Sequence, residues 1–346
     1  MTRAQLLAQI EALLSQQEPL IQRAFLQAVY DARQQMVLEI VIAALERGDI
    51  YAAADLLQID RMLLNPFDQV IQSSYIAGGN LAMDALVATA PRAMRLVMRF
   101  DAGHPEAARW LSSHSSTLVT EIVADQREGI RTALAAGMEA GRHPRGVALE
   151  VVGRMDKVSG RRVGGMIGLT SQQMGYVENA RAELTSGDPA QMRAFLGRKL
   201  RDKRLDGVVR RAIKEGKPVS AVDVERLLGR YADGLLRLRG EVVARNEALE
   251  AFSHSQWASI RQLVESGKVS EAQVEKVWSA TMDGRTRDSH AALHNHRVGM
   301  NEAFVSPLTG AQMLYPRDRS RGAPARELVQ CRCMMQPKIN FLAGAG

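Results

Sequence analysis

The chain has very little cysteine: Cys331 and Cys333 are its only two in 346 residues, and they stand two positions apart. A disulfide bond needs Cα atoms several ångströms apart and converging Cβ vectors, so a Cys-x-Cys pair is poorly placed to form one. The cysteine content therefore excludes a scaffold held by several disulfides and predicts a reducing compartment.

Aromatic residues and long apolar runs are also scarce. Phe, Trp and Tyr make up 5% of the chain, whereas hydrophobic residues make up 46%, so Ala, Leu, Val and Met carry most of the apolar share. This composition favours helices over a β-sandwich. No uninterrupted apolar run reaches about 18 residues, and no basic segment followed by an apolar one stands at the start. We expect neither a membrane-spanning segment nor a signal peptide.

Positive charge is present in excess. The formal net charge is +7 and the pI is about 9.6, which suits a polyanionic partner. Residues 193–217 contain ten Lys or Arg against three acidic residues, so this segment alone carries the excess of the whole chain. Such a segment can bind DNA by neutralising phosphates regardless of sequence. The candidate contacts are Arg198, Lys199, Arg201, Lys203, Arg204, Arg210, Arg211 and Lys214.

The simpler interpretation of this basic segment is a solvated helix face whose charges pair at i and i+4. Phe195 is its only aromatic residue, which argues against stacking on single-stranded bases. Any nucleic-acid contact is therefore expected to be non-specific and made with duplex DNA.

Apolar periodicity predicts helices over most of the chain. Residues 4–14 follow a helical period that Pro19 interrupts, and a second helix runs from Ile21 to a stop at Gly48. Further helices are expected over 50–64, 66–87 and 106–140. Between them, residues 94–100 alternate apolar and polar side chains, which predicts a strand.

The second half of the chain carries clear helix-start signals. Thr170-x-x-Gln173 is a capping box, Asp188-Pro189 supplies an N-cap and a first helical residue, and Ser220-x-x-Asp223 opens the most regular helix, with apolar steps to Phe252. Another capping box, Ser270-x-x-Gln273, predicts a helix that reaches Trp278. The glycine-rich residues 159–168 precede the first box, but they lack a Gly-Lys-Ser/Thr and are best interpreted as a structural turn.

Motifs concentrate near the C-terminus. Trp278 is followed by Asp-Gly-Arg-Thr-Arg-Asp-Ser-His at 283–290, by an aromatic-x-x-Pro-Leu-x-Gly segment at 304–310, by Leu-Tyr-Pro-Arg-Asp at 314–318 and by Cys-Arg-Cys at 331–333. Glycine and proline residues between these motifs indicate a turn-rich module. This order resembles the C-terminal module of the phage Mu F-like minor head proteins, the phage head morphogenesis family. The likeness extends upstream to residues 160–173, 201–213 and 244–249.

The resemblance implies a mainly α fold: an elongated helical body with long helices, followed by a small, short-stranded α+β module. We divide the chain into an N-terminal helical region (1–92), a helical middle region (93–255) and the Mu F-like module (256–346). The implied function is that of a minor head protein near the portal vertex of the virion, present in several copies and assembled in the host cytoplasm. Its expected partners are the portal, major capsid or scaffold protein, with packaged duplex DNA as a further candidate and no membrane.

The same module offers candidate metal ligands. Cys331, Cys333 and His290, with His294 as a fourth, are the side chains that tetrahedral zinc prefers, and small turn-rich modules often need a metal to fold. Cys-x-Cys is tighter than the usual zinc spacing. The alternative is that both cysteines are small buried residues beside Arg332 on a strand, with His290 hydrogen-bonded to backbone.

Charged residues of the module predict a structural network. Asp283 can pair with Arg285 or Arg287, because guanidinium groups bind carboxylates with two prongs; the arginines can also face phosphate or an acidic partner. A different class of function, a metal-dependent nuclease or hydrolase, would use Asp283, Asp288, His290, His294 and His296 around a catalytic ion. We expect a structural protein, not an enzyme.

Overall fold

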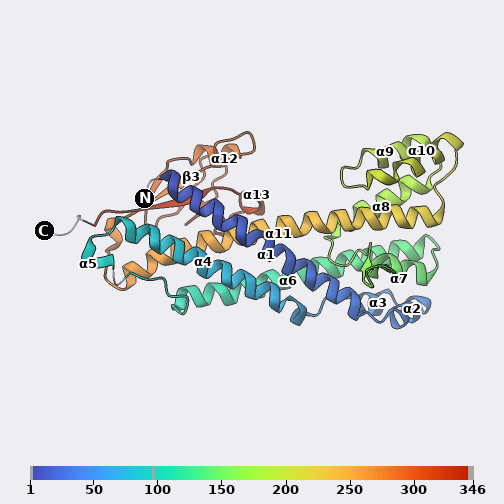
Figure 1. Ribbon diagram of the computed structural model, residues 1–346, viewed down its shortest axis with the longest axis horizontal. Helices are drawn as coiled ribbons and strands as arrows, with labels where there is room; N and C mark the ends of the chain where they lie inside the picture. Colours follow the sequence, from blue (N-terminus) through green and yellow to red (C-terminus); the bar gives the residue numbers. More distant parts are fainter. Residues whose placement is uncertain (1–2, 96–97, 342–346) are drawn as a thin grey trace. The chain divides into compact units, whose positions relative to one another are not determined.

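The computed structural model describes residues 3–95 and 98–341 and confirms a mainly α fold with short strands near the C-terminus (Figure 1). Its helices are α1 (Arg3–Gln35), α2 (Leu38–Glu46), α3 (Ile50–Leu56), α4 (Asn65–Thr89), α5 (Arg92–Arg95), α6 (Pro105–Glu139), α7 (Pro144–Val152), α8 (Ser171–Thr185), α9 (Pro189–Gly197), α10 (Asp206–Glu215), α11 (Ala221–Glu265), α12 (Asp288–Ala292) and α13 (Ala325–Leu328). Short 3-10 helices are η1 (Arg61–Leu64), η2 (Lys203–Leu205) and η3 (Glu271–Gln273). The strands are β1 (Arg154–Met155), β2 (Arg162–Val163), β3 (Val274–Ser279), β4 (Arg297–Gly299), β5 (Phe304–Val305), β6 (Gln312–Met313) and β7 (Met334–Ile339).

The chain forms two compact units, each made of separate segments. Unit 1 contains Met1–Gln22, Phe67–Ser115 and Glu241–Gly346, and unit 2 contains Arg23–Pro66 and Ser116–Gly240. The division drawn from the sequence instead follows chain order. None of the helices in the described residues is both long and apolar enough to cross a membrane.

In unit 1, the C-terminal strands form a small antiparallel sheet in the order β4-β3-β7, beside a separate β5-β6 hairpin. Trp278 on β3 is paired with Met335 on β7, and Val277 with Arg297 on β4. One core cluster joins α4, α11 and this sheet through side chains such as Met83, Trp257 and Met335. A second surrounds Trp278 and contains both cysteines.

In unit 2, α9 packs against both α8 and α10, and α2 packs on α3 and α7 (Figure 1). The predicted caps are confirmed: Thr170 and Gln173 form both hydrogen bonds of the capping box of α8, and Asp188 caps α9 with Pro189 as its first residue. A two-stranded hairpin, β1-β2, follows α7 and pairs Arg154 with Val163. It contains the first residues of the glycine-rich segment.

The regular helix predicted after Ser220 is confirmed as α11, which spans 45 residues. It continues past Phe252 because small polar residues there face glycines of α4. The Ser259 hydroxyl donates to the Gly79 carbonyl at 3.3 Å, and a Cβ on Gly78 would lie only 2.7 Å from Ser255 Oγ. Since glycine lacks Cβ, the two helices can approach closely at these positions.

Three sequence-based expectations are wrong in kind, and the helix expected from Ile21 to Gly48 is divided between α1 and α2 at residues 36 and 37. The helix predicted to break at Pro19 continues as α1. An internal proline costs about 3 kcal/mol, but Ile10, Ile21 and Phe25 on both sides of it are fully buried, and each such side chain contributes about 1.5–3 kcal/mol.

The helix expected from Ser270 to Trp278 is the second. Its capping box forms, yet it supports only η3, and β3 follows. Val274, Val277 and Trp278 favour strands, and hydrogen bonds to strands on both sides outweigh those of a helix of two turns.

The strand expected over 94–100 is the third. Residues 94 and 95 belong to α5, residues 96 and 97 lie outside the described part, and 98–100 carry no strand. Met98 is buried and Phe100 packs against the same core cluster, so core contacts of an irregular segment account for these two apolar positions.

Candidate metal centre and nucleic-acid interface

Trp278 is the centre of the C-terminal module. The side chain is fully buried, and its ring meets Phe304 and His290 edge-on, with ring centroids 5.2 and 5.5 Å away. The position of Trp278 on the middle strand of the sheet holds it there. The motif tryptophan is therefore a packing residue that fixes where His290 lies.

Asp283 ties two motifs together. Both carboxylate oxygens accept hydrogen bonds from Arg332, at 2.6 and 2.7 Å, and one also accepts from the Arg285 amide at 2.9 Å. The Arg332 guanidinium holds the pKa of this carboxyl far below its usual range, and the backbone hydrogen bond adds to the effect. The Arg285 side chain lies 3.8 Å away, and Arg287 donates to the Val329 carbonyl instead.

The structure brings together His290, Cys331 and Cys333. His290 Nδ1 lies 3.4 Å from each Sγ, and the three donor atoms lie within 4.8 Å of one another. His294 is not part of this group, because its Nδ1 accepts a hydrogen bond from the Ala280 amide at 3.1 Å. Among the described residues, no other His, Cys, Asp or Glu side chains form a metal-sized group, so the five residues of the hydrolase alternative do not meet around one ion.

Arg317 belongs to the Leu-Tyr-Pro-Arg-Asp motif, and its role is not evident from the sequence. The side chain is 2% exposed and donates to the Leu249 carbonyl at 3.2 Å, to Ser253 Oγ at 2.8 Å and to the Cys331 carbonyl. Burial raises the pKa of the Cys331 thiol, but the hydrogen bond from Cys333 and the charge of Arg317 outweigh it and leave that pKa well below the ordinary value. The cluster therefore favours a thiolate.

The basic segment 193–217 is partly neutralised by ion pairs. Arg198 binds Glu183 with two prongs at 2.7 and 2.8 Å, Arg201 binds Asp206 with both distances 2.9 Å, and Arg204 binds Asp202. Arg210 lies 3.7 Å from Asp206, one helical turn away. Four predicted contacts remain exposed without a carboxylate within 4 Å in the described residues: Lys199, Lys203, Arg211 and Lys214.

A basic cleft of about 570 Å³ forms where three parts of unit 2 meet. The β1-β2 hairpin contributes Arg161 and Arg162, and α11 contributes Arg230 and Arg237, seven residues apart on one helix face. The predicted segment contributes the rest of the cationic lining, Arg201, Lys203 and Arg204. Among the described residues, two carboxylates, Asp202 and Asp233, line the same cleft.

The glycine-rich loop beside this cleft is held by internal contacts. The Gly164 amide donates to Asp233 at 2.8 Å, and the buried Arg33 donates to the Gly165 and Ile167 carbonyls at 2.7 and 2.6 Å. These contacts show a loop fixed to the protein, in agreement with a structural turn. Arg161 and Arg162 of this loop line the cleft.

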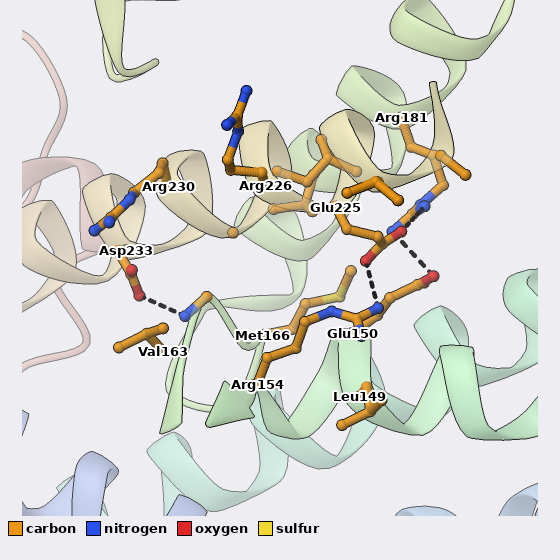
Figure 2. A pocket seen from close by; sticks show the side chains of 16 residues that line it. Leu149, Glu150, Arg154, Val163, Met166, Arg181, Glu225, Arg226, Arg230 and Asp233 are labelled. Carbon is orange, nitrogen blue, oxygen red and sulfur yellow. Dashed lines mark hydrogen bonds and ion pairs between the residues drawn. The ribbon is translucent and has the colours of Figure 1, made fainter. Parts of the chain in front are cut away.

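A second, more apolar pocket of about 490 Å³ lies beside α11 and shares Val163, Arg230 and Asp233 with the basic cleft (Figure 2). Arg181 bridges Glu150 and Glu225, and Arg154 joins Glu225 at 3.2 Å. Burial raises the pKa of Glu150 to about 7, although Arg181 and Arg142 act in the opposite direction. This ion network connects α7, α8, the hairpin and α11, so it serves to hold unit 2 together.

A mainly α body with a small antiparallel sheet carries the motifs that resemble those of the phage head morphogenesis family. The comparison with protein families is specific: residues 203–336 match the family described as phage Mu protein F like protein. The match extends from η2 through α11 into β7 and confirms the resemblance. No curated protein and no solved structure matches the chain.

Proposed function

We propose that this chain is a minor head protein that acts close to the portal vertex during head assembly, where it contacts the portal, major capsid or scaffold protein. The match of residues 203–336 to the Mu F-like family carries this proposal, since that family belongs to the structural proteins of the phage head. The matched segment includes all of α11, β3 and β4 and the first residues of β7, so it covers a long helix and most of the small sheet.

The test is the composition of particles that assemble without packaging DNA. We expect procapsids from a packaging-blocked infection to contain several copies of the chain, cross-linked to portal subunits. Procapsids that lack the chain would refute a role in assembly. Cross-links spread evenly over the capsid shell would refute the location at the portal and leave the role in assembly standing.

We further propose that the basic cleft of unit 2 contacts packaged duplex DNA. What supports this is its set of free cations: among the described residues, Arg161, Lys203, Arg230 and Arg237 have no carboxylate within 4 Å. Several guanidinium groups around one concave surface focus a positive potential that attracts phosphates. Recognition by charge alone is independent of base sequence.

Binding of the purified chain to two duplexes of unrelated sequence tests this proposal. Affinity should be equal for both, and the slope of log Kobs against log salt should be about −3 to −4, because each neutralised phosphate contributes about −0.9. An affinity that does not change with salt, or a strong preference for one duplex, would contradict a phosphate-binding cleft.

A further inference from the structure

His290, Cys331 and Cys333 come together although they are far apart in the chain and belong to different elements. His290 lies on α12, and the cysteines lie in the segment between α13 and β7. The three side chains are 1%, 1% and 2% exposed, so their polar atoms are shielded from water and need partners within the protein. Buried sulfur and imidazole groups at one point are the donor set that zinc prefers.

The spacing of the three donors fits one ion. In a tetrahedral zinc site, Zn–S bonds of about 2.3 Å and Zn–N bonds of about 2.0–2.1 Å place a sulfur and a nitrogen about 3.5 Å apart. His290 Nδ1 lies 3.4 Å from both sulfurs. A zinc ion would therefore require little movement of the donors.

The other nitrogen of His290 faces a carboxylate. Nε2 lies 2.9 Å from Glu327 Oε2, although the N–H is not aligned with it as in a good hydrogen bond, and Ser289 Oγ donates to the same oxygen at 2.9 Å. Glu327 is only 2% exposed. A carboxylate behind a metal-binding imidazole fixes the tautomer and strengthens the ligand. Here it leaves the lone pair of Nδ1 directed at the sulfurs.

The charges of this buried group balance when zinc is present. Two thiolates neutralise the ion, and Arg317 next to Cys331 balances Glu327 next to His290. Buried charges are tolerated only when they are paired or bind metal. A cavity of about 10 Å³ adjoins His290 and Cys333, which is close to the space that one water molecule needs. It provides room for a fourth ligand.

We propose that His290 Nδ1, Cys331 Sγ and Cys333 Sγ bind one zinc ion, with Glu327 as a positioning residue and the fourth coordination position open to the adjoining cavity. The ion would join α12 to the segment before β7 and so stabilise a module whose strands are only two to six residues long. The proposal does not depend on DNA or portal binding, because it concerns the isolated chain.

Metal content of the reduced, full-length chain is the first test. We expect one zinc per chain by elemental analysis, and after removal with a chelator we expect zinc, but not magnesium, to restore the thermal midpoint. Cobalt should replace zinc and give the sulfur-to-cobalt charge-transfer absorption of a thiolate site. Folded, reduced protein that takes up neither zinc nor cobalt would overturn the proposal.

Variants separate metal binding from packing. Cys333→Ser should remove the stoichiometric metal and weaken the cobalt absorption, while His294→Gln, in the same segment but outside the donor group, should keep both. Because Cys333→Ser could also disturb the core, Glu327→Gln provides a milder change. This variant should keep the circular dichroism spectrum of the folded protein and lower zinc affinity by about 10- to 100-fold. Unchanged affinity in Glu327→Gln would refute its positioning role, and full metal content in folded Cys333→Ser would refute the ligand set.

Discussion

Two buried histidines of unit 1 have opposite proton affinities. His254 is stacked on Trp110, shares a hydrogen bond of 2.9 Å between Nδ1 and the Tyr75 hydroxyl, and is 2% exposed. Burial lowers its pKa to about 3, and the nearby charge of His114 adds to this. For His114, burial also lowers the pKa, but Glu247 at 2.6 Å and Glu250 at 3.5 Å more than compensate, so its pKa is raised. At neutral pH His254 is a neutral packing residue.

His254 should therefore cause acid destabilisation. The unfolded chain protonates this imidazole below about pH 6.5, while the folded chain does not until about pH 3. The contribution of neutral His254 to the free energy of unfolding is therefore fully present above the unfolded pKa. It is lost as pH falls, by about 2 kcal/mol at pH 5. Chemical denaturation of His254→Gln should show a smaller loss between pH 7 and 5. The exposed His296→Gln provides the control, and equal pH dependence in all three proteins would contradict the prediction.

At the scale of elements, unit 2 depends on a contact between the glycine-rich loop and α11. Gly164 has φ +74°, and a Cβ there would lie 2.6 Å from the Gly229 Cα. The reverse is different, since a Cβ on Gly229 would lie 3.4 Å from the Gly164 Cα, an ordinary contact. The loop can therefore accept no side chain, whereas the helix can.

This asymmetry predicts that alanine at Gly164 and alanine at Gly229 change the stability of the protein differently. Gly164→Ala should lower the free energy of unfolding by about 2–4 kcal/mol, from left-handed strain and overlap together. Gly229→Ala should be neutral or stabilise by up to about 1 kcal/mol, because alanine favours helix. Gly160→Ala, with positive φ but no atom within 4 Å, isolates the strain at about 1 kcal/mol. Equal losses for Gly164→Ala and Gly160→Ala by urea denaturation would show that the close contact does not matter.

Sequence patterns predicted local features of these elements better than they predicted pairings. Thr170, Asp188 and Ser220 act within four residues of themselves, so their caps could be identified from spacing. By contrast, β3 is a strand because distant β7 and β4 pair with it, and a capping box cannot report that. His290 and the cysteines were identified by type, but Glu327 behind the imidazole was not, because only the fold brings α13 to α12.

At the scale of the whole molecule, a net charge of +7 favours polyanionic partners wherever the charges lie. The segment 193–217 was identified because its charges are consecutive, but several of them are used in ion pairs such as Arg198–Glu183 and Arg201–Asp206. The hairpin and α11 arginines of the basic cleft are scattered along the sequence and were missed. Location, and not total charge, distinguishes the cleft from the rest of the surface.

Charge-matched variants can separate location from total charge. Replacing Arg161, Arg230 and Arg237 with Gln should weaken duplex binding by tenfold or more and reduce the salt slope by roughly 2 to 3, because each lost phosphate contact removes about 0.9. A control variant with Arg47→Gln, Arg92→Gln and Arg326→Gln removes the same number of charges at three exposed positions outside the cleft.

A third variant, with Arg210, Arg211 and Lys214 changed to Gln, tests the contacts expected on α10. The three arginines of the cleft variant line one concave surface, whereas those of the other two sets do not line it. The cleft variant should therefore lose the most affinity for duplex DNA. Equal losses in all three proteins would mean that net charge alone attracts DNA, and the largest loss in the α10 variant would move the interface to that helix.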